Sequence, residues 1–205
     1  METVLYLVRH AQAQPLPAVA ESEWALSAHG QMQARALVPI LTALGIQRVY
    51  SSPFRRSQDT LRPFAEENEI PLLVHDGLRE RRLATSWIGD FRPVWERSWA
   101  DFSYALDGGE NSLVCRSRMA ETVAALCASH RGEVLAAGSH GYAIGLFLTT
   151  LDPAFGIIEA SALRTPEIIR LVANQAGLRW DRTFNAGADF DAIATHFRQT
   201  PGIKA

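Results

Sequence analysis

Two histidines and two arginines stand just after apolar runs of the sequence, where a strand would end. Arg9 and His10 follow LYLV, Arg56 comes shortly after RVYSS, and His140 follows EVLAAGS. Arginine binds phosphate through paired N–H groups, and neutral imidazole is a nucleophile that can accept a phosphoryl group. If the fold brings these four side chains together, they form an anion site at which phosphoryl transfer to a histidine is chemically available.

The elements that must position these residues alternate between strand and helix along the chain. Apolar runs predict strands at residues 3–8, 48–52, 72–76 and 133–139, and apolar residues at helical spacing predict helices at 26–44, 53–68, 111–130 and 141–151. Two further strands are predicted at 167–172 and 178–181, around an NQAG turn typical of a hairpin. This alternation predicts a three-layer α/β/α sandwich with a mostly parallel central sheet.

In such a sheet, ligands bind beyond the carboxyl ends of the strands, which is where the four residues are expected. Residues 85–109 fit neither a helix nor a strand period and are rich in aromatic residues, among them Trp87, Trp95 and Trp99. They either form a small cap insertion over this edge of the sheet or complete the core. Some of the aromatic residues can belong to a cap and others to the core.

Composition limits the classes of protein that this chain can be. Its 205 residues, 47% hydrophobic and 20% charged, predict one globular domain over 1–205, and the net charge of −2 argues against a nucleic-acid partner. The first residues lack the pattern of a signal peptide, and no apolar run approaches the roughly 18 residues of a membrane span. We expect a cytoplasmic protein without a membrane partner, in which Cys115 and Cys127 are reduced. The sequence does not indicate its oligomeric state.

Five motifs in this order resemble those of the histidine phosphatase superfamily, the phosphoglycerate mutase-like proteins, and of its phosphatase branch in particular. They are LVRHAQAQ, SSPFRRSQDT, LRERRL, GGEN and GSHGYAI, and the resemblance covers roughly residues 4–170. It implies that His10 is the nucleophile that becomes phosphorylated, and that Arg9, Arg56 and His140 hold the phosphoryl oxygens. It also implies that Glu80 is the acid that protonates the leaving oxygen and later the base for water, with no metal and no cofactor.

Alternatives remain at several positions near these motifs. Glu80 could instead form surface ion pairs with the arginines around it in LRERRL. Of the two adjacent arginines, the family motif aligns with Arg56, so Arg55 is expected to face solvent. Arg118 is expected, like Arg116, on a solvated helix face. The family frequently has an asparagine that reaches the phosphate after RHGE; this chain reads RHAQAQPLP, with Gln12 or Gln14 as possible substitutes.

The function predicted from these features is a metal-independent phosphomonoesterase, a phosphoric monoester hydrolase of the histidine acid phosphatase type, which acts on small phosphorylated metabolites. The alternative is a bisphosphoglycerate-dependent phosphoglycerate mutase, which would need a fuller cover than the stretch ERSWADFSYALDGGEN indicates. A third hypothesis, an inactive phospholigand-binding module, rests only on RHAQ in place of RHGE. The physiological substrate stays open.

Overall fold

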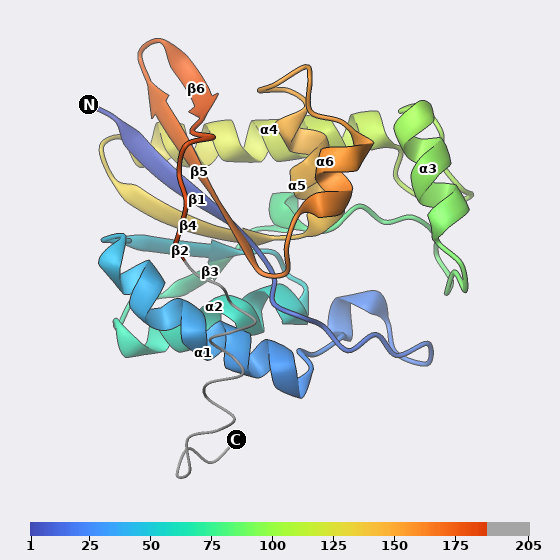
Figure 1. The fold of residues 1–205 in the computed structure, drawn as a ribbon, viewed down its shortest axis with the longest axis horizontal. Coiled ribbons are helices and arrows are strands. Elements are labelled where there is room, and N and C mark those ends of the chain that lie inside the picture. The colour runs from blue at the N-terminus through green and yellow to red at the C-terminus, as the bar shows by residue number, and fades with distance from the viewer. Residues whose placement is uncertain (188–205) are drawn as a thin grey trace.

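A six-stranded, mostly parallel sheet forms the centre of the protein in a computed structural model that describes residues 1–187. The strand order is β3-β2-β4-β1-β5-β6; neighbours among the first four strands run parallel, whereas β5 is antiparallel to β1 and to β6 (Figure 1). The strands are β1 (Thr3–Arg9), β2 (Arg48–Ser51), β3 (Leu72–Val74), β4 (Val134–Ser139), β5 (Glu167–Asn174) and β6 (Gly177–Trp180).

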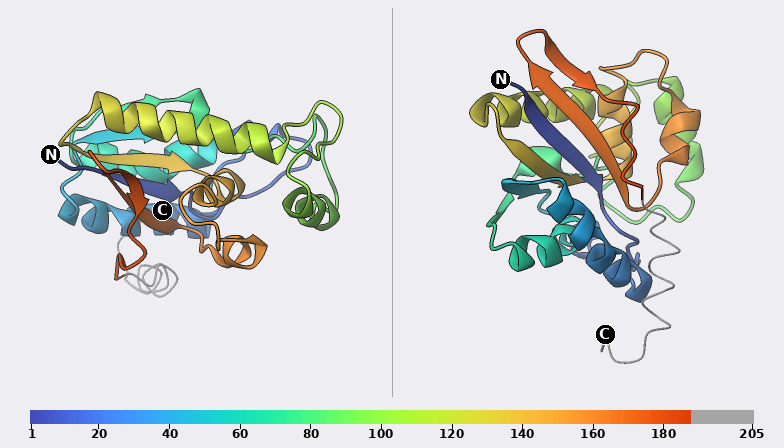
Figure 2. Two further views of the ribbon diagram at one scale, coloured as in Figure 1. Left: turned by 90° about the horizontal axis from the view of Figure 1, so that it is seen from above. Right: turned by 60° about the vertical axis from the view of Figure 1, so that its left-hand side comes forward.

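Helices cover both faces of the sheet, which confirms the predicted three-layer α/β/α fold (Figures 1 and 2). The side chains of Asn111 and Ser27 cap the first turns of α4 and α1 by accepting backbone N–H groups. The helices are α1 (Ala28–Ala43), α2 (Arg55–Glu67), α3 (Arg92–Ala100), α4 (Ser112–Ser129), α5 (Gly141–Leu148) and α6 (Ile157–Ala162), with short 3₁₀ turns η1 (Glu21–Glu23) and η2 (Asp76–Leu78).

The core is divided by the sheet because successive residues of a strand point to opposite faces. Leu5 and Leu7 of β1 pack against α4 and α5, whereas Tyr6 and Val8 pack against α1 and α2. All four side chains are buried. The central strand β1 is therefore apolar on both faces, as expected for a strand covered by helices on each side.

Residues 85–109, the predicted cap region, contain the helix α3, which the sequence period did not indicate. In Figure 1, α3 lies beyond the carboxyl end of β1, away from the sheet. Within it, Trp95 and Trp99 pack against Tyr142 of α5, so part of this region joins the core. The single domain over 1–205 stays a prediction, since residues 188–205 lie outside the described part.

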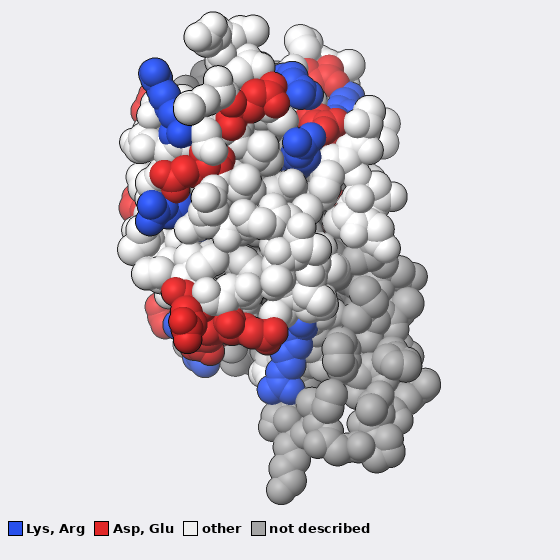
Figure 3. Space-filling view, turned by 90° about the vertical axis from the view of Figure 1, so that its left-hand side faces the viewer, with Lys and Arg blue, Asp and Glu red and all other residues white. Residues whose placement is uncertain are grey.

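The surface beside the amino-terminal end of β1 carries charges of both signs in small groups around a broad uncharged area (Figure 3). Among residues 1–187, no helix is both long and apolar enough to cross a membrane. Both cysteines, Cys115 and Cys127, are buried and unpaired, as predicted.

Candidate active site

The carboxyl ends of three parallel strands bring the predicted site residues to one edge of the sheet. Arg9 ends β1 opposite Ser139 of β4, and the backbone N–H of His10 donates to the Ser139 carbonyl over 3.1 Å. On the other side of β4, Ser52 N–H donates to the Gly138 carbonyl over 2.9 Å. The hydrogen bonds between the strands therefore fix the backbone of His10 and Ser52 relative to the end of β4.

His10 is held in the neutral form with one ring nitrogen available for chemistry. Its Nδ1 lies 2.7 Å from the Ala11 carbonyl, which can only accept a hydrogen bond, so Nδ1 carries the proton and Nε2 keeps its lone pair. Burial, assisted by the positive charge of Arg56, lowers the pKa of His10 to about 3. A neutral imidazole with an unprotonated Nε2 is the nucleophilic form of histidine.

His140 is fully buried next to His10, with 5.2 Å between the ring centroids. Its Nε2 lies 2.7 Å from the hydroxyl of Ser52, which also accepts the Phe54 N–H. Its Nδ1 is buried and has no hydrogen-bond partner among the described residues. Burial and then the charge of Arg56 hold the pKa of His140 well below its usual value. A buried ring nitrogen of this kind is suited to contact a ligand.

Arg9 places its guanidinium against the start of α5. One of its N–H groups donates to the Leu163 carbonyl over 2.5 Å, and its Nε has no partner among the described residues. A Cβ at Gly141 would lie 2.8 Å from the Arg9 guanidinium carbon, so only glycine leaves room for this approach. The arginine thus packs against the first residue of α5, whose next two backbone N–H groups donate to Glu80.

Arg56 contacts His10 directly, and only 4% of its side chain is exposed. Its Nε donates to His10 Nε2 over 3.2 Å, while Nη1 and Nη2 donate to the backbone carbonyl and the carboxylate of Glu21 over 2.7 and 2.8 Å. The rings of Trp24 and Phe54 lie over its guanidinium, 5.5 and 5.0 Å from the guanidinium carbon. Arg56 is therefore fixed in place by contacts on every side.

Glu80 reaches the start of α5 rather than the arginines around it. Its carboxylate accepts the backbone N–H groups of Ala143 and Arg81 over 2.8 Å and of Tyr142 over 3.2 Å. Arg79 pairs with Asp76 and Glu110, and the Arg81 side chain is buried away from the carboxylate. Among residues 1–187, Glu80 therefore forms none of the surface ion pairs that were the alternative for it.

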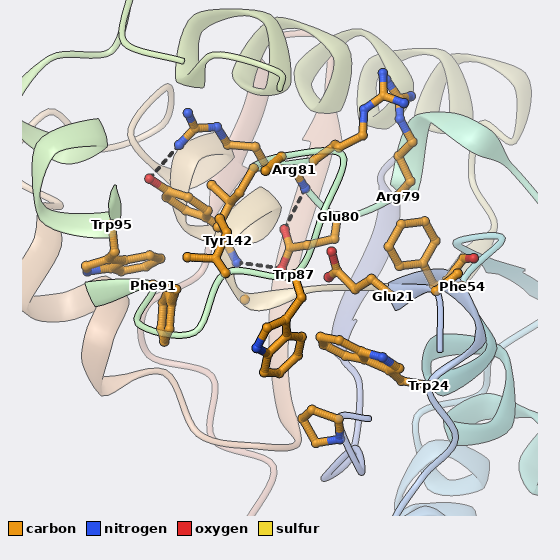
Figure 4. A pocket seen from close by; sticks show the side chains of 18 of the residues that line it. Glu21, Trp24, Phe54, Arg79, Glu80, Arg81, Trp87, Phe91, Trp95 and Tyr142 are labelled. Atoms are coloured by element: carbon orange, nitrogen blue, oxygen red, sulfur yellow. Dashed lines mark hydrogen bonds between the residues drawn. The ribbon is translucent and has the colours of Figure 1, made fainter. Parts of the chain in front are cut away.

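A pocket of about 1360 Å³ opens in front of His10, Arg9 and Glu80 (Figure 4). Arg56 and His140 are buried and are not among the residues that line it. In Figure 4, Glu21 and Glu80 lie close together, and Trp87 lies between Glu80 and Trp24. Aromatic side chains make up much of the remaining lining: Trp24, Phe54, Trp87, Phe91, Trp95 and Tyr142.

Several neighbours of the site were not predicted from the sequence. Glu21 and Trp24 belong to the irregular segment between β1 and α1, where no hydrophobic period singles them out. Gln12, which was considered as a phosphate contact, instead accepts the hydroxyl of Ser27, and neither it nor Gln14 lines the pocket. Arg55 is exposed, as predicted.

The expectation of a solvated Arg118 is wrong. Only 12% of its side chain is exposed, and its Nη2 lies 2.7 Å from the buried carboxylate of Glu110. The two residues meet because α4 starts directly after the DGGEN turn and Arg118 lies two turns along it. Within the described residues, no group of three or more His, Cys, Asp and Glu side chains is placed to hold a metal ion.

Comparison with known proteins agrees with this geometry. The chain has the fold of a mycobacterial glucosyl-3-phosphoglycerate phosphatase (22% identity, TM-score 0.71, covering 88% of this chain and 97% of that one). It is also similar to a mutant phosphoserine phosphatase from Entamoeba histolytica in complex with phosphoserine (17%, 0.72, 87% and 94%). A third similar structure is YhfR from Bacillus stearothermophilus (18%, 0.74, 92% and 99%).

No curated protein sequence matches the chain significantly. The profile of the histidine phosphatase superfamily (branch 1) matches residues 5–182, which include each of the predicted site residues. The chain therefore belongs to branch 1 of the histidine phosphatase superfamily.

Proposed function

We propose that this protein is a phosphoric monoester hydrolase that works through a phosphohistidine at His10. The observation that carries the proposal is the state of His10: it is half-buried and neutral, its Nδ1–H is tied to a carbonyl, and its Nε2 accepts a hydrogen bond from Arg56. The phosphatases with similar structures support the same reaction class.

The proposed reaction has two steps. In the first, His10 Nε2 attacks phosphorus, the bond to the ester oxygen breaks, and a protonated Glu80 gives its proton to the leaving oxygen. In the second, the Glu80 carboxylate takes a proton from water as the water oxygen attacks phosphorus, and the bond to Nε2 breaks to release inorganic phosphate. His10 returns to its neutral form with Nδ1 still protonated.

Arg9, Arg56 and His140 are the groups that we propose to hold the phosphoryl oxygens. Arg56 donates to His10 Nε2, Arg9 is the residue before His10, and the ring of His140, with its unpartnered Nδ1, lies 5.2 Å from that of His10. Charge that builds up on the phosphoryl oxygens during transfer would be stabilised by groups already in place.

The substrate that we propose is a small phosphorylated metabolite, whose leaving group occupies the wider part of the pocket. That part is lined by Trp87, Phe91 and Trp95 of the cap region, together with Trp24. Flat apolar side chains of this kind accept leaving groups of varied shape, which favours a broad range of phosphate esters. The unpaired state of both cysteines supports a cytoplasmic location.

The test is phosphate release from a panel of phosphomonoesters in the presence of EDTA, with wild type and His10→Ala compared. We expect turnover by wild type only. Equal turnover by both proteins would contradict the proposal. If wild type isomerises phosphoglycerate in a bisphosphoglycerate-dependent reaction that far exceeds hydrolysis, the protein is a mutase instead. If wild type catalyses neither reaction, the protein is an inactive binding module.

A further inference from the structure

Glu21 occupies the edge of Arg56 on which a phosphoryl group would bind. The Nε–H of a guanidinium and one N–H of the Nη2 group point the same way, and this pair is the edge that grips two oxygens of one phosphate. In Arg56, Nε faces His10 Nε2 at 3.2 Å and Nη2 faces Glu21 Oε1 at 2.8 Å. The carboxylate of Glu21 thus accepts a hydrogen bond from Arg56 Nη2, an N–H group that would otherwise bind a phosphoryl oxygen next to His10.

The position of Glu21 leaves its carboxylate able to move. Its backbone carbonyl is held by Arg56 Nη1, whereas its side chain is 38% exposed and borders the pocket. Rotation of the side chain towards the pocket would free Nη2 without moving the backbone of η1. Arg56 cannot make a matching move, because Trp24 and Phe54 pack over its guanidinium and its side chain is 4% exposed.

The charges around Glu21 also favour its displacement when an anion binds. A phosphoryl dianion next to His10 would stand close to both the Glu21 and the Glu80 carboxylates, which face the same space in Figure 4. Glu80 is fixed by three backbone N–H groups, so Glu21 is the carboxylate that can withdraw. Burial, opposed by Arg56 and assisted by Glu80, raises the pKa of Glu21.

We propose that the Glu21 carboxylate competes with the phosphoryl group for Arg56. Each phosphoryl group that binds displaces the Glu21 carboxylate from Nη2, and the carboxylate returns when inorganic phosphate leaves. The exchange weakens the hold of the site on free phosphate and so limits inhibition by the product. The inference rests on the proposed function, because it takes the phosphoryl site to lie between His10 and Arg56.

The experiment is calorimetric titration of inorganic phosphate into wild type, Glu21→Gln and Glu23→Gln at constant ionic strength and pH. Glu23 belongs to the same short turn but is exposed and outside the pocket, so its substitution removes an equal charge without touching Arg56. We expect Glu21→Gln to bind phosphate about fivefold to tenfold more tightly, and Glu23→Gln to match wild type within about twofold. Phosphate inhibition of turnover should strengthen by the same factor.

Unchanged or weaker phosphate binding by Glu21→Gln would overturn the inference and would make Glu21 a residue that holds Arg56 in position. Absence of phosphate binding from all three proteins would overturn it as well. If Glu21→Gln does not fold, Glu21→Asp, whose shorter side chain draws the carboxylate back from Nη2, should show a smaller gain in affinity. Tighter phosphate binding by Glu21→Gln, with no turnover in any of the proteins, would support the inference and contradict the proposed hydrolase. Turnover without tighter phosphate binding by Glu21→Gln would support the hydrolase and overturn the inference.

Discussion

At the scale of single residues, the site combines two neutral histidines, the half-buried His10 and the buried His140, with two arginines. Histidine keeps its lone pair at Nε2 only while it is uncharged, and the burial of His10 together with the charge of Arg56 keeps it so. The same burial disfavours charge on His140. This arrangement favours anion binding, and it also makes the stability of the fold depend on pH.

The low pKa of His10 predicts a loss of stability in acid. In the unfolded chain a histidine has a pKa of about 6.5, whereas in the folded protein that of His10 is about 3. Between these values the unfolded state binds the extra proton, so the His10 contribution is complete above the unfolded pKa and declines as the pH falls towards 3. One proton corresponds to about 1.4 kcal/mol per pH unit in the free energy of unfolding.

Urea unfolding of wild type and His10→Gln at several pH values between about 4 and 7 measures how the free energy of unfolding depends on pH. The substitution should reduce the pH slope by up to about 1.4 kcal/mol per unit. An unchanged slope would mean that His10 is charged in the folded protein or ionises there as it does in the unfolded chain.

Ser52 is predicted to position His140. Its buried hydroxyl is the partner of His140 Nε2, and Ser52→Ala would leave that nitrogen without a partner in a fully buried place. We expect the free energy of unfolding to fall by about 1–3 kcal/mol. Because the His140 ring is no longer held, kcat should fall by roughly tenfold while KM changes less, a split that steady-state kinetics can measure. A KM effect alone would contradict a positioning role.

At the scale of elements, the segment after η2 connects the cap region to the sheet. Arg81, which is 1% exposed, donates to the Tyr142 hydroxyl over 2.6 Å and to the Glu110 and Tyr104 carbonyls over 2.7 and 3.0 Å. These bonds tie α5, the start of α4 and the end of the cap region to the residue next to Glu80. Glu80, the proposed acid, is thus next to a network that joins three parts of the fold.

Replacement of Arg81 by methionine should therefore be costly. It would leave several buried acceptors without a donor, and we expect the free energy of unfolding to fall by roughly 3 kcal/mol. Arg82→Met is the matched control, because Arg82 is exposed, and its effect should stay within about 0.5 kcal/mol. Chemical denaturation of both variants decides the matter, and equal effects would show that the buried network contributes little.

The aromatic lining of the cap region makes a separate prediction about substrates. Trp87 is 48% exposed at the pocket, with its ring 5.8 Å from that of Trp24, so an aromatic leaving group could lie against it. Trp87→Ala should raise KM for phenyl or naphthyl phosphate about threefold to tenfold and leave KM for glycerol phosphate within about twofold. A similar rise for both kinds of ester would mean that Trp87 shapes the pocket without selecting aromatic groups.

At the scale of the whole molecule, the sequence predicted the parts of the fold that depend on local periods. The parallel strands and their polar exits followed from apolar runs, and this was enough to bring Arg9, His10 and His140 to one edge. The position of β5 between β1 and β6 could not be derived, because strand order depends on contacts between distant segments. The spacing of Trp95 and Trp99 was a helical signal for α3, but Pro93 and the surrounding polar residues concealed it.

The unpredicted members of the site share a physical reason. Glu21 and Trp24 reach Arg56 across a gap of more than thirty residues, and such contacts leave no periodic trace in a sequence. The error at Arg118 has the same origin, since charge at helical spacing indicates an exposed face unless a buried carboxylate such as Glu110 is nearby. Residues positioned by strand ends were thus predictable, and those positioned by irregular segments were not.

The most direct test of the account is detection of the phosphorylated enzyme. Wild type is mixed with a phosphate ester carrying labelled phosphorus, denatured rapidly in alkali to preserve a phosphoramidate, and mapped by mass spectrometry. The account predicts label on His10 in wild type and in Glu23→Gln, and loss of the labelled peptide in His10→Ala. Rapid hydrolysis with no label on His10, or with label on another residue, would contradict a phosphohistidine mechanism at this site.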